Sequence, residues 1–219
     1  MCFCYTVQIM TTGVDINRTR LDDLDRIIIR DSLAEPFEKQ IICNFGSGAS
    51  MLSSALAGLG HRVYNYDNRN LHTFFALQQE QGNKVYFQQI HLQKIKRVNL
   101  PKQYNIVVAQ RVLHYLKYTD AQKFLMSASR GLASGGTVYM SLTGIESAIA
   151  YTYDQKDAHI EKRWGALSAE EQEKFDIKQP VCLYSLDNAQ QLIDSIDGLQ
   201  IEKIWQSQFG NIKVVAIKK

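Results

Sequence analysis

Hydrophobic and polar positions along this chain follow two different periods, and the two alternate. Short runs that are apolar almost throughout are typical of buried strands, and apolar residues three or four positions apart indicate helices with one buried face. Runs of the first kind predict strands at Gln40–Phe45, His61–Asp67, Lys84–Gln89, Tyr104–Ala109 and Thr137–Leu142. Stretches of the second kind predict helices over Leu21–Ile28, Met51–Leu59, Leu71–Gln81 and Asp120–Arg130, the last of them capped by Asp120. The alternation predicts an α/β fold with right-handed crossovers and a doubly wound, mostly parallel sheet.

The last third of the chain departs from this alternation. Residues Thr143–Tyr184 are polar and aromatic, and Ser168 with Glu171 forms a capping-box pattern that predicts a helix start. A helix over Ser185–Ile196 follows, and then two strands, Leu199–Gln206 and Asn211–Lys218, on either side of a glycine turn. We therefore expect one domain over residues 1–219, with a seven-stranded sheet in which only the last strand is antiparallel to its neighbours. We expect residues 143–184 to form an insert that covers the carboxyl ends of the strands.

The composition narrows the class of protein without identifying a partner. A length of 219 residues suits one domain with a full sheet, and a net charge of +3 is too small to make nucleic acid the expected partner. No apolar run is long enough to span a membrane, and the N-terminus lacks the basic start and apolar core of a signal peptide. The cysteines, Cys2 and Cys4 among them, have neither C-x-x-C nor zinc spacing, so we expect no metal site and reduced thiols in the cytoplasm.

A glycine turn follows the first predicted strand. Gly46-Ser47-Gly48 joins this strand to a helix, and glycines without Cβ atoms let a ligand approach the backbone near the free amides of the helix N-terminus. Asp67 ends the next strand 21 residues after Gly46, close to the spacing of about 20 residues for an acid that binds ribose hydroxyls. Together these features predict a nucleotide site. Met51 stands where the dinucleotide fingerprint has its third glycine, which argues against NAD and a nucleotide-dependent oxidoreductase.

Several segments resemble the motifs of class I S-adenosylmethionine-dependent methyltransferases. Ile41–Gly48 with Leu56–Asp67 resembles their first motif and the acid that follows it, and Tyr104–Leu116 resembles their fourth motif. Gly131–Val138 resembles the turn before their fifth strand, and the terminal helix and hairpin match the end of the family's sheet. The resemblance implies a Rossmann-like methyltransferase fold, S-adenosylmethionine as cofactor, and methyl transfer to a small-molecule acceptor. Nothing in the sequence indicates an oligomeric state.

The resemblance also implies roles for the matching positions. The turn Gly46-Ser47-Gly48 would let the cofactor pass close to the backbone, Asp67 would hold the ribose hydroxyls, and Asn68 would lie beside the adenine. Gln110 and Arg111, at the end of the fourth strand, would line the methionine end and the mouth of the acceptor site.

The sequence departs from the family at three positions. Asn44 replaces the acid usually found two residues before the first glycine, Ser50 replaces a common third glycine, and His91 aligns with an acid beyond the third strand. Asn44 can form hydrogen bonds but cannot balance the charge of the cofactor's ammonium or sulfonium. Two functions therefore remain open. One is a methyltransferase that still binds its cofactor, with Asn44 and His91 in the cofactor site. The other is a degenerate methyltransferase-fold protein that acts as a binding or regulatory partner without catalysis.

A base is needed only if the methyl acceptor must lose a proton. His114 is the candidate catalytic base, because histidine titrates near neutrality and this one follows the fourth strand, where ligands of parallel sheets bind. A histidine that packs or caps a helix start is the alternative. The candidate substrate-binding residues are Tyr115, Tyr151, Tyr153 and Trp164, since an aromatic cover suits a small, partly apolar or planar molecule. Simple packing of the insert is the alternative for these aromatic residues.

Overall fold

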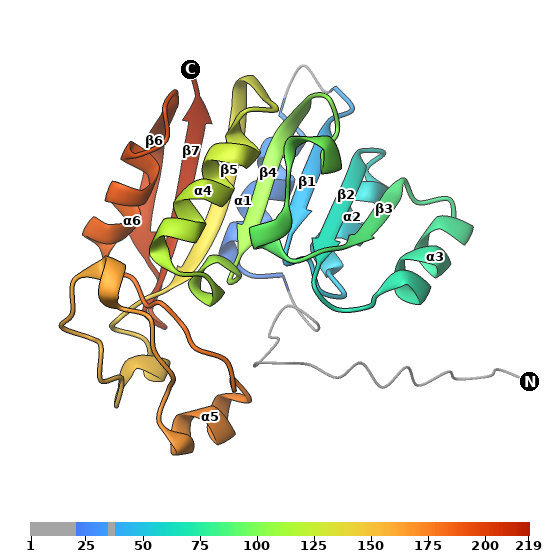
Figure 1. The fold of residues 1–219 in the computed structure, drawn as a ribbon. Helices are drawn as coiled ribbons and strands as arrows, with labels where there is room; N and C mark the ends of the chain where they lie inside the picture. The colour runs from blue at the N-terminus through green and yellow to red at the C-terminus, as the bar shows by residue number, and fades with distance from the viewer. Residues whose placement is uncertain (1–20, 35–37) are drawn as a thin grey trace, which may run out of the picture.

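One sheet organises the residues that the computed structural model describes, 21–34 and 38–219. Its strands are β1 (Ile41–Phe45), β2 (Arg62–Asp67), β3 (Val85–Gln89), β4 (Tyr104–Gln110), β5 (Leu132–Thr143), β6 (Leu199–Gln206) and β7 (Asn211–Lys218). They form one seven-stranded sheet in the order β3-β2-β1-β4-β5-β7-β6 (Figure 1). Cys2 and Cys4 lie outside the described residues.

The pairing of the strands confirms the predicted fold class. The strands from β3 to β5 pair in parallel with their neighbours, and β7 is antiparallel to both β5 and β6. β7 therefore enters between β5 and β6 as a hairpin strand, as the glycine turn in the sequence predicts. The predicted bounds of β6 and β7 agree with the observed ones.

Helices cover both faces of the sheet. They are α1 (Asp23–Ser32), α2 (Met51–Gly58), α3 (His72–Glu80), α4 (Tyr118–Ser129) and α6 (Leu186–Asp194), whereas α5 (Ala169–Phe175) lies in the insert. Leu24 of α1, Leu56 of α2 and Phe75 of α3 pack in one apolar cluster, whereas Phe124 of α4 and Leu192 of α6 pack in another. In Figure 1, α4 and α6 accordingly lie in front of the sheet and α1 and α2 lie behind it.

Two of the predicted element starts are wrong. Asp120 does not cap α4, because the helix begins two residues earlier, at Tyr118, and Asp120 lies in its first turn. A carboxylate there still interacts favourably with the positive end of the helix dipole. β5 begins at Leu132 rather than Thr137, because Leu132 pairs with Tyr104 before a shift of register. The Gly135-Gly136 pair, taken as a turn before the strand, therefore lies within β5.

The insert has a small core of its own. Tyr153, Leu167, Val181 and three further apolar residues, Ala150, Ile177 and Leu183, form this third cluster. Ser168 caps α5 by accepting a hydrogen bond from the Glu171 amide at 3.2 Å, as predicted. The reciprocal half of the capping box is absent from the described contacts, since the Glu171 carboxylate accepts from the Thr152 amide at 2.9 Å and ties the helix to the rest of the insert.

The register of the parallel strands determines where functional groups meet. Phe45 at the end of β1 pairs with Tyr66 of β2 and with Ala109 of β4. The residues that follow these three strands therefore emerge together at one edge of the sheet, which is where doubly wound proteins bind ligands. No described helix is both long and apolar enough to cross a membrane. Over the same residues, no group of three or more His, Cys, Asp or Glu side chains is placed to hold a metal ion.

Candidate functional site

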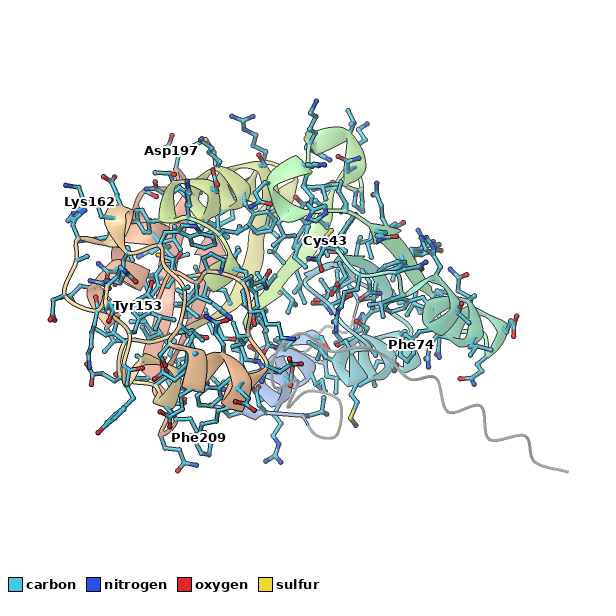
Figure 2. The ribbon with its side chains drawn as sticks, turned by 60° about the horizontal axis from the view of Figure 1, so that its bottom comes forward. Cys43, Phe74, Tyr153, Lys162, Asp197 and Phe209 are labelled. Carbon is cyan, nitrogen blue, oxygen red and sulfur yellow. The ribbon has the colours of Figure 1, made fainter. Side chains whose placement is uncertain are left out.

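A cavity of about 590 Å³ opens at the carboxyl ends of the parallel strands. The glycine turn and the residues that follow β2, β3 and β4 line one side, and the insert and the β6–β7 turn line the other. Figure 2, in which this edge comes forward, labels Tyr153 in the insert and Phe209 in the β6–β7 turn. A volume of this size is typical of a small-molecule or cofactor site.

The glycine turn owes its shape to packing within the protein as well as to room for a ligand. Gly46 and Gly48 have φ values of +63° and +55°, a backbone conformation that side chains disfavour. A Cβ on Gly46 would lie 2.4 Å from Cγ2 of Val112, so the turn and the loop after β4 are in direct contact. The Gly46 amide donates to the Tyr66 carbonyl at 2.7 Å, which holds the turn against β2.

Asp67 is a buried carboxylate at the wall of the cavity, with 5% of its surface exposed. Its Oδ2 accepts from the Gly48 amide at 2.8 Å, so the acid and the glycine turn are held together. Its Oδ1 accepts from both the amide and the Nε of Arg69, at 2.9 and 3.1 Å. Arg69 was not singled out from the sequence, and this ion pair partly occupies the oxygens expected to bind ribose.

Asn44 does not line the cavity. It lies 4% exposed beneath the turn, where its Nδ2 donates to Ser53 Oγ at 2.9 Å, and Ser53 in turn donates to Asn65 Oδ1 at 2.6 Å. This buried chain of polar groups needs a donor at position 44, which an amide provides and an ionised carboxylate does not. The replacement of the family's acid by Asn44 therefore has an explanation in packing.

Gln110 brings a buried acceptor to the cavity. Its Nε2 donates to the Asp25 carboxylate of α1 at 2.6 Å. The amide oxygen, Oε1, takes no part in this contact. Among the described residues, no donor reaches that oxygen. Burial, followed by repulsion from Asp22, raises the pKa of Asp25. A buried acceptor that lacks a partner is costly unless a ligand supplies the donor.

Arg111 brings a positive charge to the same wall. Its φ of +50° is unusual for a side-chain-bearing residue, and the Ser141 carbonyl holds this conformation by accepting from its amide at 2.9 Å. Within residues 21–34 and 38–219, its guanidinium forms neither an ion pair nor a hydrogen bond. Strained backbone of this kind is concentrated at functional sites.

The comparisons with known proteins agree with this geometry. Residues 43–140 match a family model described as a methyltransferase domain. This match spans a little under half of the chain, and the chain as a whole has the Rossmann-like methyltransferase fold. No curated protein matches it significantly.

Solved structures resemble this chain in fold at low sequence identity. A protein of Pyrococcus horikoshii is 13% identical with a TM-score of 0.71, over 96% of this chain and 97% of its own. An S-adenosylmethionine-dependent methyltransferase of Mesorhizobium loti is 16% identical with a TM-score of 0.66, over 89% and 98%. Magnesium protoporphyrin IX methyltransferase of Synechocystis, solved with S-adenosylmethionine bound, is 15% identical with a TM-score of 0.59, over 89% and 78%.

His114 lies in the cavity wall but is not a strong base. Only 3% of its surface is exposed, and its Nδ1 lies 3.2 Å from Thr143 Oγ1. Burial, and then the positive charge of Arg111, lowers the pKa of His114 to about 3. The imidazole is therefore neutral at neutral pH and a weak proton acceptor.

The remaining predicted residues divide into two groups. Asn68, His91, Tyr115 and Trp164 line the cavity, and the first two are exposed residues near Asp67. Tyr151 and Tyr153 do not line it. Tyr151 is 90% exposed, and Tyr153 is buried in the core of the insert, where its hydroxyl contacts the Val181 carbonyl at 2.7 Å.

Sequence reasoning missed lining residues that are distant in the chain. Phe175, Ile177 and Pro180 of the insert line the cavity, and so do Phe209 and Asn211 of the β6–β7 turn. The turn reaches the cavity because β7 begins where β5 ends, with Asn211 opposite Thr143 in the register. The predicted hairpin contained this information, since an antiparallel strand beside β5 must start at the edge where β5 finishes.

Proposed function

We propose that this chain transfers a methyl group from S-adenosylmethionine to a small-molecule acceptor. The observation that carries the proposal is the set of cofactor-complementary groups along one wall of the cavity. Asp67 offers a carboxylate beside the glycine turn, and Gln110 offers a buried oxygen without a partner some distance along the same wall. These groups fit the two polar ends of the cofactor, because ribose hydroxyls donate to a carboxylate and an ammonium group donates to an amide oxygen.

The residues of this chain then act mainly by position. When bound, S-adenosylmethionine supplies an activated methyl group. Gly46 and Gly48 leave room beside the backbone, Asp67 orients the ribose, and Gln110 holds the ammonium end. The insert excludes water above the reacting atoms, and alignment of this kind can supply much of the rate enhancement. Neutral His114 contributes a hydrogen-bonding group rather than a base.

A binding protein without catalysis is the second candidate function. The contact of Arg69 with Asp67 favours this second function. To reach the carboxylate, ribose hydroxyls must either share it with Arg69 or displace Arg69 from it. In a methyltransferase, Arg69 would move aside, and the bonds from the ribose hydroxyls would have to offset the loss of this largely buried ion pair, whose side chains are 23% and 5% exposed. Cofactor affinity therefore discriminates between the two functions.

Calorimetry with S-adenosylmethionine, S-adenosylhomocysteine and NAD on one sample tests the proposal. We expect both sulfur nucleosides to bind and NAD not to bind. Asp67→Ala should weaken S-adenosylhomocysteine at least about tenfold, because a hydrogen bond to a charged group contributes roughly 1.5–3 kcal/mol. Asp197→Ala, an exposed acid outside the cavity lining, is the matched control and should not change the affinity. A sample without heat or thermal shift at millimolar S-adenosylhomocysteine would support the second candidate instead.

A further inference from the structure

The charges in the cavity are unequal. Among the described residues that line it, Asp67 is the only carboxylate, and Arg69 already pairs with it at 3.1 Å. Arg111 is the other arginine of the lining. Because the first arginine is balanced by Asp67 and the second is not, the described lining has an excess of positive charge.

Among the described residues, no carboxylate forms an ion pair with Arg111. Asp25 interacts with Arg111 electrostatically, but it lies outside the lining, and its oxygens accept from Gln110 and from the Asp22 amide. His114 is neutral and adds no charge. The backbone bond from Arg111 to Ser141 holds the residue at the cavity, where its guanidinium donors have no described acceptor.

The cofactor does not supply the missing negative charge. S-adenosylmethionine has one carboxylate but two positive groups, the ammonium and the sulfonium, so its binding adds a further net positive charge. In a partly enclosed cavity such charges interact strongly, because the effective dielectric constant is lower than in water. Once the cofactor is bound, the remaining space therefore favours an anion.

Aromatic and aliphatic side chains form part of the same cavity lining. Tyr115, Trp164, Phe175 and Ile177 line the cavity, and Phe209, 63% exposed, lies at its margin. Such walls suit the flat or hydrocarbon part of a small molecule. An anion that also has an apolar body matches both the charge and the wall.

We propose that the methyl acceptor is an organic carboxylate with an apolar or aromatic body, and that Arg111 binds its carboxylate group. This inference rests on the proposed function. A guanidinium binds a carboxylate through two parallel hydrogen bonds, and it keeps its charge at all physiological pH values. The apolar body then lies against aromatic side chains of the lining, Tyr115 of the segment after β4 and Trp164 of the insert.

Titration of the protein saturated with S-adenosylhomocysteine tests this assignment without any turnover. The probes are 3-phenylpropionate, 3-phenylpropanamide and 3-phenylpropylamine, which share one apolar body and differ in the charge of the end group. We expect the carboxylate to bind about tenfold more tightly than the amide, and the amine to bind least, as measured by NMR titration. Arg111→Gln should abolish the difference between carboxylate and amide, and Arg111→Lys should retain part of it. Arg130→Gln, an exposed arginine outside the lining, is the matched control and should retain all of it.

Three results would overturn the assignment while leaving the proposed function intact. The first is equal or tighter binding of the amide or the amine, and the second is no binding of any probe. The third is an Arg111→Gln variant that loses affinity for S-adenosylhomocysteine but not for 5′-methylthioadenosine, which lacks the amino-acid part. That result would assign Arg111 to the cofactor's own carboxylate. Failure of S-adenosylhomocysteine to bind the wild-type protein would instead refute the proposed function.

Discussion

Gly46 shows how a residue expected to serve a ligand also serves the fold. The sequence suggested that a side chain here would obstruct the cofactor, but a Cβ would first meet Val112 at 2.4 Å. Gly46→Ala should therefore destabilise the protein by about 2–5 kcal/mol, from overpacking and from the left-handed φ together. Urea unfolding measures this change.

A double-mutant cycle separates the two causes. Val112→Gly removes all three Val112 atoms that the new Cβ would meet, its own Cβ included, so Gly46→Ala should cost less in that background, by about 1–3 kcal/mol. Gly58→Ala is the control, since a Cβ at Gly58 has no atom within 4 Å and its φ is ordinary. A cost for Gly46→Ala that is unchanged by Val112→Gly would show that backbone strain alone is responsible.

At the residue scale, the sequence located the cavity wall better than it described the state of each side chain. Gly46, Asp67 and Gln110 were identifiable because each directly follows or ends a parallel strand, and such ends meet at one edge. The contact of Arg69 with Asp67 and the burial of His114 were not identifiable. Both depend on packing between segments, which spacing along the chain does not contain.

At the scale of elements, hydrophobic periodicity was sufficient for most strands and helices. It failed where a partner, rather than the local pattern, decides the boundary. β5 extends back to Leu132 because Tyr104 offers a pairing position there, although Gly135 and Gly136 have poor strand propensity. The core of the insert was likewise hidden, since its aromatic residues gave no indication of which of them are buried.

Tyr153 and Tyr151 make the structure of the insert testable. The Tyr153 hydroxyl lies 2.7 Å from the Val181 carbonyl and 3.0 Å from the Arg163 carbonyl, so it ties the first part of the insert to its middle and to its last residues. Tyr153→Phe should lower the free energy of unfolding by about 1–2 kcal/mol, because it removes a buried hydrogen bond. Tyr151→Phe, at a position that is 90% exposed, should have no measurable effect.

Hydrogen exchange locates the consequence of the Tyr153 change. In Tyr153→Phe, amide hydrogen exchange should be faster than in the wild type in residues 144–184 but little changed in β1 and β4. The reason is that the insert packs around its own small core. Affinity for S-adenosylhomocysteine should stay within about twofold of wild type, since Tyr153 does not line the cavity. Equal stability of the two tyrosine variants would contradict the anchoring role of Tyr153.

For the whole molecule, buried groups with altered pKa values make stability depend on pH in opposite directions. Burial raises the pKa of Asp25, so this carboxyl destabilises the folded state at neutral pH and does so less on acidification. Burial lowers the pKa values of His61 and His114, and these residues have the reverse effect. The net profile is a sum over such groups, so a single group has to be isolated by comparing one variant with the wild type.

His114 gives the clearest pH dependence. Its pKa is about 3 in the folded protein, against 6.5 for an ordinary histidine. As the pH falls below 6.5, the unfolded chain takes up a proton that the folded protein does not, so the stability contributed by neutral His114 is progressively lost down to pH 3. Between pH 7 and 5, this loss amounts to about 2 kcal/mol.

His114→Gln cannot take up that proton, so its free energy of unfolding should fall by about 2 kcal/mol less over the same interval. Urea unfolding of both proteins at pH 7, 6 and 5 measures the difference, and any constant cost of the substitution cancels. Parallel profiles for the two proteins would mean that His114 titrates alike in the folded and unfolded chains, and a histidine with an ordinary pKa at the cavity wall would again be a candidate base.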